Sequence, residues 1–201
     1  SPSPTDTLSR QAAAADEQGY IILGQDDGTQ TAGGVFYPTG DISPDTLIVI
    51  ADDDGSLPDG LTEAKLESLV AAKRAEPEAR SSVGTAGPVT PLSTTIYSWS
   101  AFSSGYSSPF TGGSVWGTSD SLRVGYSFAT VAGYNQRASG QGLGFYRGYN
   151  GSQFGVWEKW YYIGTTGSSY VTSTVPWGNV AATKKFMAIC TQTVSCWGDW
   201  Y

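Results

Sequence analysis

The most constraining feature of this chain is a pair of alternating aromatic segments on either side of the dipeptide Asn150-Gly151. Asn-Gly suits both central positions of a type I′ turn, which makes it the strongest short-range signal for a β-hairpin. A two-residue turn at this dipeptide predicts that Tyr149 pairs with Ser152 and Phe145 with Val156. The C-terminal half must therefore accommodate long antiparallel strands.

Further strand signals follow one another from about Thr94, with turn residues between them. All seven Trp residues lie in this part of the chain. Several short antiparallel strands within about 100 residues favour a β-sandwich or a small barrel. We therefore expect an aromatic, Gly-rich β-domain at residues 94–201. Its clearest half-buried strand alternates Leu122, Val124, Tyr126 and Phe128 with small or polar residues.

The first 90 residues have a different character. They carry five basic and fifteen acidic side chains, whereas residues 91–201 carry six basic and three acidic ones. A helix is expected at residues 11–18, and a second begins near Thr62. The sequence predicts an acidic arm or small α/β segment at residues 1–90, with a linker at residues 80–93. The apolar runs of this part are Tyr20–Leu23, Val35–Tyr37 and Leu47–Ile50.

Charge and hydropathy narrow the possible partners and compartments. Six scattered cations in the β-domain argue against nucleic acid as a partner. No apolar run of about 18 residues predicts a transmembrane helix. The chain begins Ser1-Pro2-Ser3-Pro4, which we interpret as a mature chain after removal of a signal peptide. We therefore expect a secreted, extracellular protein.

The two cysteines, Cys190 and Cys196, are separated by a short polar segment. An even count in a Gly-rich chain of low charge favours a disulfide and an oxidising compartment. The spacing places the pair across a hairpin. The expected bond is structural, since the chain contains neither Cys-x-x-Cys nor any His.

One face of the predicted hairpin is the candidate binding surface. Gly144, Gly148 and Gly155 leave the aromatic side chains on this face clear of their neighbours. Exposed aromatic rings beside an amide and an ammonium suit stacking on sugar rings or a protein hot spot. The alternative is that a second sheet covers this face, with the glycines permitting close approach. The candidate residues are Tyr146, Gln153, Trp157, Lys159 and Tyr161.

Enzymatic chemistry has little support in the residue pattern. The absence of His removes imidazole-dependent triads and most zinc chemistry. Glycoside hydrolysis needs two carboxylates, and Glu158 between Trp157 and Trp160 is the candidate acid. Its alternative role is a carboxylate at a sheet edge paired with Lys159 or an Arg. We therefore expect a protein that is not an enzyme and has no cofactor.

An acidic loop follows the third apolar run at Asp52–Asp59. Oxygen-rich loops can hold Ca²⁺, and Glu63 occupies the twelfth position counted from Asp52. An EF-hand loop requires Gly at the sixth position, where this chain has Leu57. The other interpretation is an acidic turn before a helix N-terminus, where carboxylates are favoured.

Four short segments form a recognisable pattern: Gly112–Gly117, Tyr126-Ser127, the segment from Gly155 through Trp157 to Lys159, and the terminal Trp200-Tyr201. Together they resemble the lactococcin-972-type bacteriocins. The resemblance spans residues 112–201 and implies a small secreted β-sandwich with a role in antagonism between bacteria. The chain departs from this family in its two cysteines, its longer inter-strand segments and its acidic N-terminal half.

The leading functional hypothesis is a non-catalytic binding or assembly protein. It would act as an adaptor in a secreted bacterial assembly, such as a toxin complex. The arm or the aromatic β-face would hold a protein partner, the arm by adding its apolar runs to a sheet edge. A carbohydrate-binding, lectin-like module is the second hypothesis. A bacteriocin-like toxin is the third.

Overall fold

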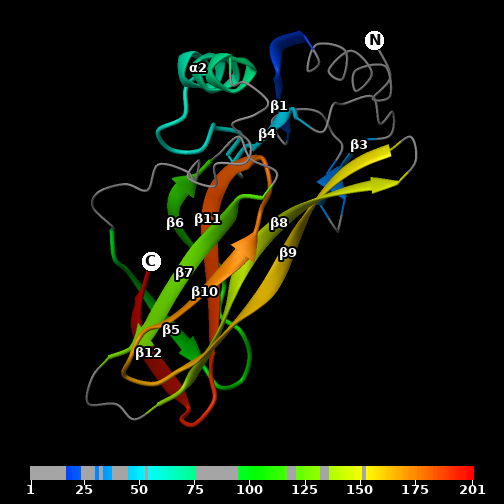
Figure 1. The fold of residues 1–201 in the computed structure, drawn as a ribbon. Helices are drawn as coiled ribbons and strands as arrows, with labels where there is room; N and C mark the ends of the chain where they lie inside the picture. Colours follow the sequence, from blue (N-terminus) through cyan, green and yellow to red (C-terminus); the bar gives the residue numbers. More distant parts are fainter. Residues whose placement is uncertain are drawn as a thin grey trace.

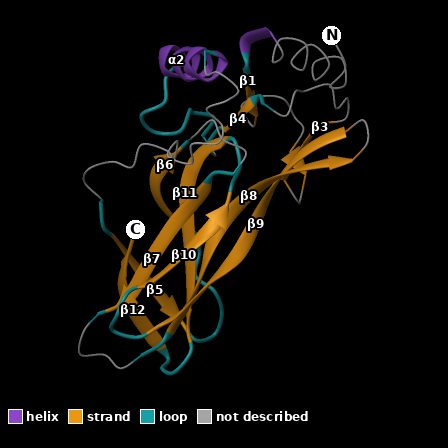
Figure 2. Cartoon of the chain, viewed as in Figure 1, coloured by secondary structure: helices purple, strands orange, loops and turns teal. Residues whose placement is uncertain are grey.

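A computed structural model describes residues 17–23, 30–31, 34–37, 45–52, 54–75, 95–116, 121–131, 136–150 and 153–201. For residues 30–31, 34–37, 146–150 and 153–158 it describes the backbone alone. The protein is mainly β, with two sheets and the helix α2 (Figures 1 and 2). No helix among the described residues is long and apolar enough to cross a membrane.

The larger sheet has eight strands and contains the two longest strands of the protein. Its main path runs β1-β4-β11-β8-β9-β3-β2, and β6 pairs with β11 beside that path. The strands are β1 (Tyr20–Leu23), β2 (Gln30–Thr31), β3 (Gly34–Tyr37), β4 (Leu47–Ile50), β6 (Phe110–Val115), β8 (Ala138–Asn150), β9 (Gln153–Thr166) and β11 (Val180–Cys190).

The smaller sheet has four antiparallel strands in the order β10-β7-β12-β5. The core between the sheets is aromatic. The Trp200 ring stacks on the Phe186 ring with centroids 5.1 Å apart, and the Phe128 ring lies 5.3 Å from the Phe186 ring. These contacts join the two sheets as the predicted sandwich. The strands are β5 (Tyr97–Phe102), β7 (Arg123–Thr130), β10 (Val171–Pro176) and β12 (Ser195–Trp200).

The hairpin of β8 and β9 forms with a register that differs from the prediction. Asn150 pairs with Gln153 and Tyr149 with Phe154, so the predicted pairs of Tyr149 with Ser152 and Phe145 with Val156 are wrong. Residues 151–152, between the paired strand ends, lie outside the described residues; in the sequence, a dipeptide with Gly first also meets a hairpin preference. The slip amounts to two residues, so the backbone register still groups each residue with cross-strand neighbours of its predicted face.

Strands from the N-terminal half belong to the larger sheet. β4 pairs in parallel with β1 and with the start of β11, where Val180 lies opposite Ile48. Ile48 and Ile50 join the core between the sheets, whereas Leu47 and Val49 pack under α2. The predicted linker at residues 80–93 lies outside the described residues. The division into domains stays a prediction, and the strands before it share a core with those after it.

The predicted helix is α2 (Glu63–Arg74), with Thr62 as its N-cap. The Thr62 side chain accepts a hydrogen bond from the Lys65 backbone N–H at 3.1 Å, as Ser and Thr caps commonly do. Leu61, just before the cap, and Leu66, the fourth residue of the helix, are both buried in the cluster beneath the helix, the arrangement of a hydrophobic staple. Of the helix predicted at residues 11–18, only the last residues are described.

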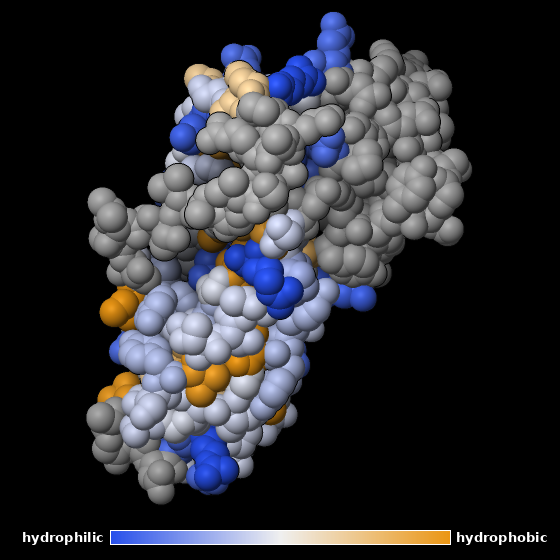
Figure 3. Space-filling view, viewed as in Figure 1, coloured by the Kyte–Doolittle hydropathy of each residue, from blue (hydrophilic) through white to orange (hydrophobic). Residues whose placement is uncertain are grey.

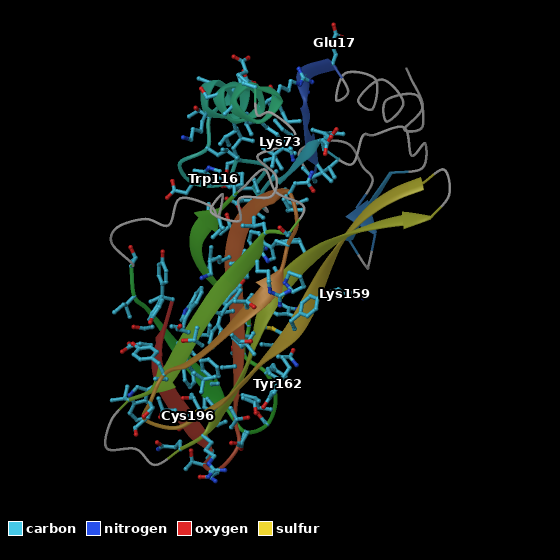
Figure 4. All side chains as sticks on the ribbon, in the orientation of Figure 1. Glu17, Lys73, Trp116, Lys159, Tyr162 and Cys196 are labelled. Atoms are coloured by element: carbon cyan, nitrogen blue, oxygen red, sulfur yellow. A yellow bond between two sulfur atoms is a disulfide. The ribbon has the colours of Figure 1, made fainter. Side chains whose placement is uncertain are left out.

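The disulfide joins the two sheets at one end of the molecule. Cys190 ends β11 and Cys196 lies in β12, and they are bonded with their Cα atoms 5.9 Å apart. The predicted bond is therefore confirmed, but the predicted hairpin is wrong, because the two cysteines lie on strands of different sheets. Figure 4 places Cys196 at the end of the sandwich opposite α2.

Candidate binding surface

The predicted hairpin face is only partly described. Tyr146 and Trp157 are directly paired, and Gln153 lies opposite Asn150. The side chains of Tyr146, Gln153 and Trp157 lie outside the described residues. Lys159 is exposed and Tyr161 is half-buried; Figure 4 labels Lys159 on β9.

The smaller sheet covers the part of this face nearest the body of the sandwich. A Cβ on Gly142 would lie 3.1 Å from the Tyr126 ring, and one on Gly144 would lie 2.3 Å from both Tyr161 and Val175. Glycine is needed here because the aromatic rings of the core occupy the space. Tyr161 packs against that core. The alternative of a covered face therefore describes this part of the hairpin.

Next along β9 come the exposed residue Tyr162 and, just after it, a β-bulge. The register shifts between Gly140 and Gln141, which places Ile163 as an extra residue before Gly164. Gly164 has a φ of 125°, a conformation that favours glycine. Ile163 is buried, whereas Tyr162 is 61% exposed on the outer surface. The sequence placed Tyr162 on the core-like face, and that assignment is wrong. Tyr162 keeps its register opposite Gln141, but the smaller sheet packs on the other, glycine-bearing face of the hairpin.

The outer face of the smaller sheet carries a group of exposed aromatic residues that the sequence analysis did not select. Along β12, Cys196, Gly198 and Trp200 are buried and face the larger sheet. Trp197 and Asp199 alternate with them and are exposed, and Tyr201 continues the outer row. Tyr170 precedes β10, and its ring lies 5.4 Å from that of Tyr201. We call Tyr170, Trp197, Asp199 and Tyr201 the β12 face.

Backbone pairing and hydroxyl groups position the β12 face. Tyr201 exchanges two backbone hydrogen bonds with Ser127, which fixes the chain end against β7. The Ser127 and Thr172 hydroxyl groups are hydrogen-bonded at 2.7 Å across β7 and β10. The rings of Tyr170 and Tyr201 therefore stand over a polar but internally bonded part of the sheet.

The electrostatic environment of Tyr170 reflects its neighbours. Burial raises the pKa of the Tyr170 phenol, and the charges of Asp199 and Tyr201 raise it further. Tyr170 is therefore a neutral hydroxyl group, able to donate a hydrogen bond, throughout the physiological pH range. The Asp199 carboxylate beside it is an acceptor on the same face.

Apolar side chains surround the β12 face. Val131 lies beside Trp197, since its backbone N–H donates to the Trp197 carbonyl oxygen at 3.0 Å. Ile96 and Phe102 are 57% and 63% exposed at the two ends of β5, and Val194 is exposed just before β12. Figure 3 shows separate hydrophobic patches among hydrophilic residues on the side of the molecule in view.

In the acidic loop, the carboxylates of Asp52 and Asp54 accept hydrogen bonds from groups of the protein itself. The Asp52 carboxylate accepts a hydrogen bond from the Thr183 hydroxyl at 2.7 Å. Asp54 accepts bonds from the backbone N–H and the hydroxyl group of Ser56. These bonds lower the pKa of the Asp54 carboxyl group. The described residues hold no group of three or more potential metal ligands, and the side chain of Glu158, the candidate acid, lies outside them.

A lysine connects the two sheets at the edge of the core. Lys184 on β11 donates through Nζ to the Gly125 carbonyl oxygen on β7 at 2.6 Å. The same atom lies 4.4 Å from the centroid of the Tyr126 ring. Burial lowers the pKa of the Lys184 ammonium group to about 8.

Comparison with models of known protein families, with curated proteins and with solved structures found no match.

Proposed function

We propose that the protein is a non-catalytic binding protein that docks a partner protein on the β12 face. The observation that carries this proposal is the exposure of Trp197 and Tyr170 on a well-paired sheet whose opposite side is the core. Large aromatic residues on the surface supply much of the binding energy in protein interfaces. A rigid sheet holds them without ordering a loop on binding.

The residues around the β12 face favour a protein over a small ligand. Ile96, Phe102, Val131 and Val194 add exposed apolar area at its margins. Interfaces are enriched in Trp, Tyr and Phe and poor in Lys and Glu, as this region is. Asp199 lies within the region, so the complementary partner surface is apolar with an Arg or Lys facing this carboxylate.

A carbohydrate-binding module is the second candidate, and one observation favours it. The Asp199 carboxylate and the two tyrosines lie together on the face, where a sugar would find both ring surfaces and hydrogen-bonding groups. The apolar margins described above are more extensive than a sugar ring requires. We therefore place the protein partner first.

The proposal includes secretion and assembly outside the cell. The Cys190–Cys196 disulfide supports an oxidising compartment. β1, β3 and β4, which the sequence offered for pairing with a partner, are paired within the protein's own sheet. That pairing favours the β12 face over the arm as the docking surface. A part in a toxin complex, or a bacteriocin-like activity, stays a prediction from the sequence resemblance.

The test is copurification of the full chain with proteins of the native secretome, followed by identification of what is retained. We expect Trp197→Ala to lose a partner that the unchanged protein retains, at a cost of at least ~2 kcal/mol of binding. Tyr162→Ala is the matched control, because Tyr162 is an exposed aromatic residue on the other sheet.

A partner that Tyr162→Ala loses and Trp197→Ala retains would contradict the assignment of the β12 face. Binding of soluble oligosaccharides that Trp197→Ala or Asp199→Asn abolishes, with no retained protein, would favour the carbohydrate candidate.

A further inference from the structure

β5 forms one edge of the smaller sheet, and its hydrogen-bonding direction follows from its neighbour β12. The Val131 N–H donates to the Trp197 carbonyl oxygen, and Tyr201 exchanges bonds with Ser127. The backbone groups of these alternate residues of β12 therefore point to β7. In an antiparallel sheet the backbone N–H and C=O groups of the intervening residues, such as Gly198, must point the other way, to β5.

The alternation carries through to β5. Trp99 lies opposite Gly198 and directs its backbone groups to β12, so Ser98 and Ser100 direct theirs to the free edge. Both serines are exposed. Phe102 also faces this edge but forms a bridge with Gly105, which caps that end. Within the described residues, no strand pairs with this edge of β5.

We propose that β5 pairs antiparallel with β5 of a second copy of the chain, about a two-fold axis at Trp99. Ser98 of each copy then lies opposite Ser100 of the other as a hydrogen-bonded pair. The same register places Ile96 beside Phe102 of the second copy on the outer surface. A two-fold interface must be self-complementary, and this strand offers an apolar residue at each end with serines between them.

The charge pattern supports a second copy as the occupant. Residues 94–104 contain no charged residue and no proline. Natural edge strands are commonly protected by Lys, Pro or a bulge, and β5 has none of these devices over Tyr97–Phe102. Because a two-fold axis brings each residue near its own equivalents, an uncharged strand avoids the repulsion between like charges.

Pairing of β5 would extend the smaller sheet into a continuous sheet through both copies. One cross-strand row would then run through both copies. It would contain Asp199 and Ser98 of one copy, followed by Ser100 and Trp197 of the other. The two β12 faces would then form one surface. This inference goes beyond the proposed function and does not depend on it, since the dimer can form whatever the outer face binds.

The experiment is sedimentation equilibrium of the full, oxidised chain over a wide concentration range. We expect a monomer–dimer equilibrium for the unchanged protein. Ser98→Pro removes an outward N–H on an edge where proline is tolerated, and should raise the dimer dissociation constant about tenfold or more. Ser98→Ala keeps the N–H and should dimerise like the unchanged protein.

A second pair of variants covers the case in which Ser98→Pro fails to fold. Ser100→Lys introduces an ammonium group near its own equivalent across the axis and should also weaken the dimer about tenfold. Ser168→Lys adds the same charge at an exposed residue before β10, the opposite edge of the smaller sheet, and should leave the dimer unchanged. A monomer at every concentration, or a dimer that Ser100→Lys leaves intact, would overturn the proposal.

Discussion

Trp197 and Trp200 lie on the same six-residue strand, yet they belong to different surfaces. Trp200 is fully buried and stacks on Phe186 of the opposite sheet, whereas Trp197 is 38% exposed on the outer face. One lies between the sheets and the other outside them, as the alternation of a strand dictates. The inner side of the smaller sheet therefore contributes stability, and the outer side is available for binding.

The comparison also explains why the hairpin face is a poor guide to binding. Its glycines resemble a cleared platform in the sequence, but near the body of the sandwich they accommodate the Tyr126 ring of β7 and the Val175 side chain of β10. The aromatic residues of the β12 face lie instead on the outer side of the sheet that supplies those two side chains. Position relative to the second sheet thus decides the role of an aromatic residue.

The strongest test of the inner surface removes the N-terminal strands. A chain of residues 95–201 loses Ile21, Leu23, Ile48 and Ile50 from the core between the sheets. Because each fully buried aliphatic side chain contributes about 1.5–3 kcal/mol, we expect the free energy of unfolding to fall by ~5 kcal/mol or more. Urea denaturation of the oxidised chains measures it. A shortened chain as stable as the full one would instead support the boundary predicted from the sequence.

The two tryptophans provide the direct test. We expect Trp200→Ala to lower the free energy of unfolding by about 3–5 kcal/mol, because it removes a fully buried ring. Trp197→Ala should lower it by no more than about 1 kcal/mol and should reduce partner binding instead. Thermal and urea unfolding of both variants, measured beside the unchanged protein, separates the two roles. Equal losses of stability would show that the outer face is also structural.

Removal of the disulfide tests how far the contact between the two sheets depends on a covalent bond. Replacing both Cys190 and Cys196 by Ala opens a short ring, and we expect a loss of about 2 kcal/mol of stability in the chain-entropy model. The unchanged protein with and without reductant provides the comparison, and the double variant should be insensitive to reductant. A variant as stable as the oxidised protein would mean that packing alone holds the sheets together.

Lys184 gives the smallest expected effect, a pH dependence arising at the edge of the inner surface. Burial lowers its pKa to about 8 from the ordinary value of 10.5. Between these values the unfolded chain binds more protons than the folded one, so the free energy of unfolding rises with pH. The bond to Gly125 and the contact with the Tyr126 ring favour the ammonium, so we expect a rise of about 1 kcal/mol.

The measurement is urea denaturation between pH 8 and about pH 9.5, below the range in which tyrosines titrate. Lys184→Met is the control and should lack this rise. A free energy of unfolding that falls with pH in the unchanged protein, relative to Lys184→Met, would show that the folded state binds the proton more tightly.

Local signals predicted much of this fold. The alternation of Val124, Tyr126 and Phe128, the N-cap Thr62 and the cysteine spacing each depend on neighbours in the sequence, and each has the predicted outcome. The hairpin turn was misplaced because two adjacent dipeptides, Asn150-Gly151 and Gly151-Ser152, both satisfy turn preferences. Local preference cannot distinguish them.

Long-range pairing escaped prediction for a different reason. Nothing near Ile48 indicates that Val180 is its neighbour, because an apolar strand can pair with any similar strand. For the same reason the sequence could not show which face of β8 the second sheet covers. The β12 face did have a local signal: the alternation of Trp197, Asp199 and Tyr201 with Cys196, Gly198 and Trp200.

The pairing of β4 with β11 has a consequence for how the chain is made. The Asn179 side-chain amide donates to the Thr46 carbonyl oxygen across 133 residues of sequence. Ribosomes release the N-terminus first, so β1 and β4 emerge long before the strand that completes their sheet. Contacts this distant in sequence also slow folding, because a long loop must close before they form. β1 can pair with β4 early, but β4 reaches its second partner, β11, only after nearly the whole chain has been made.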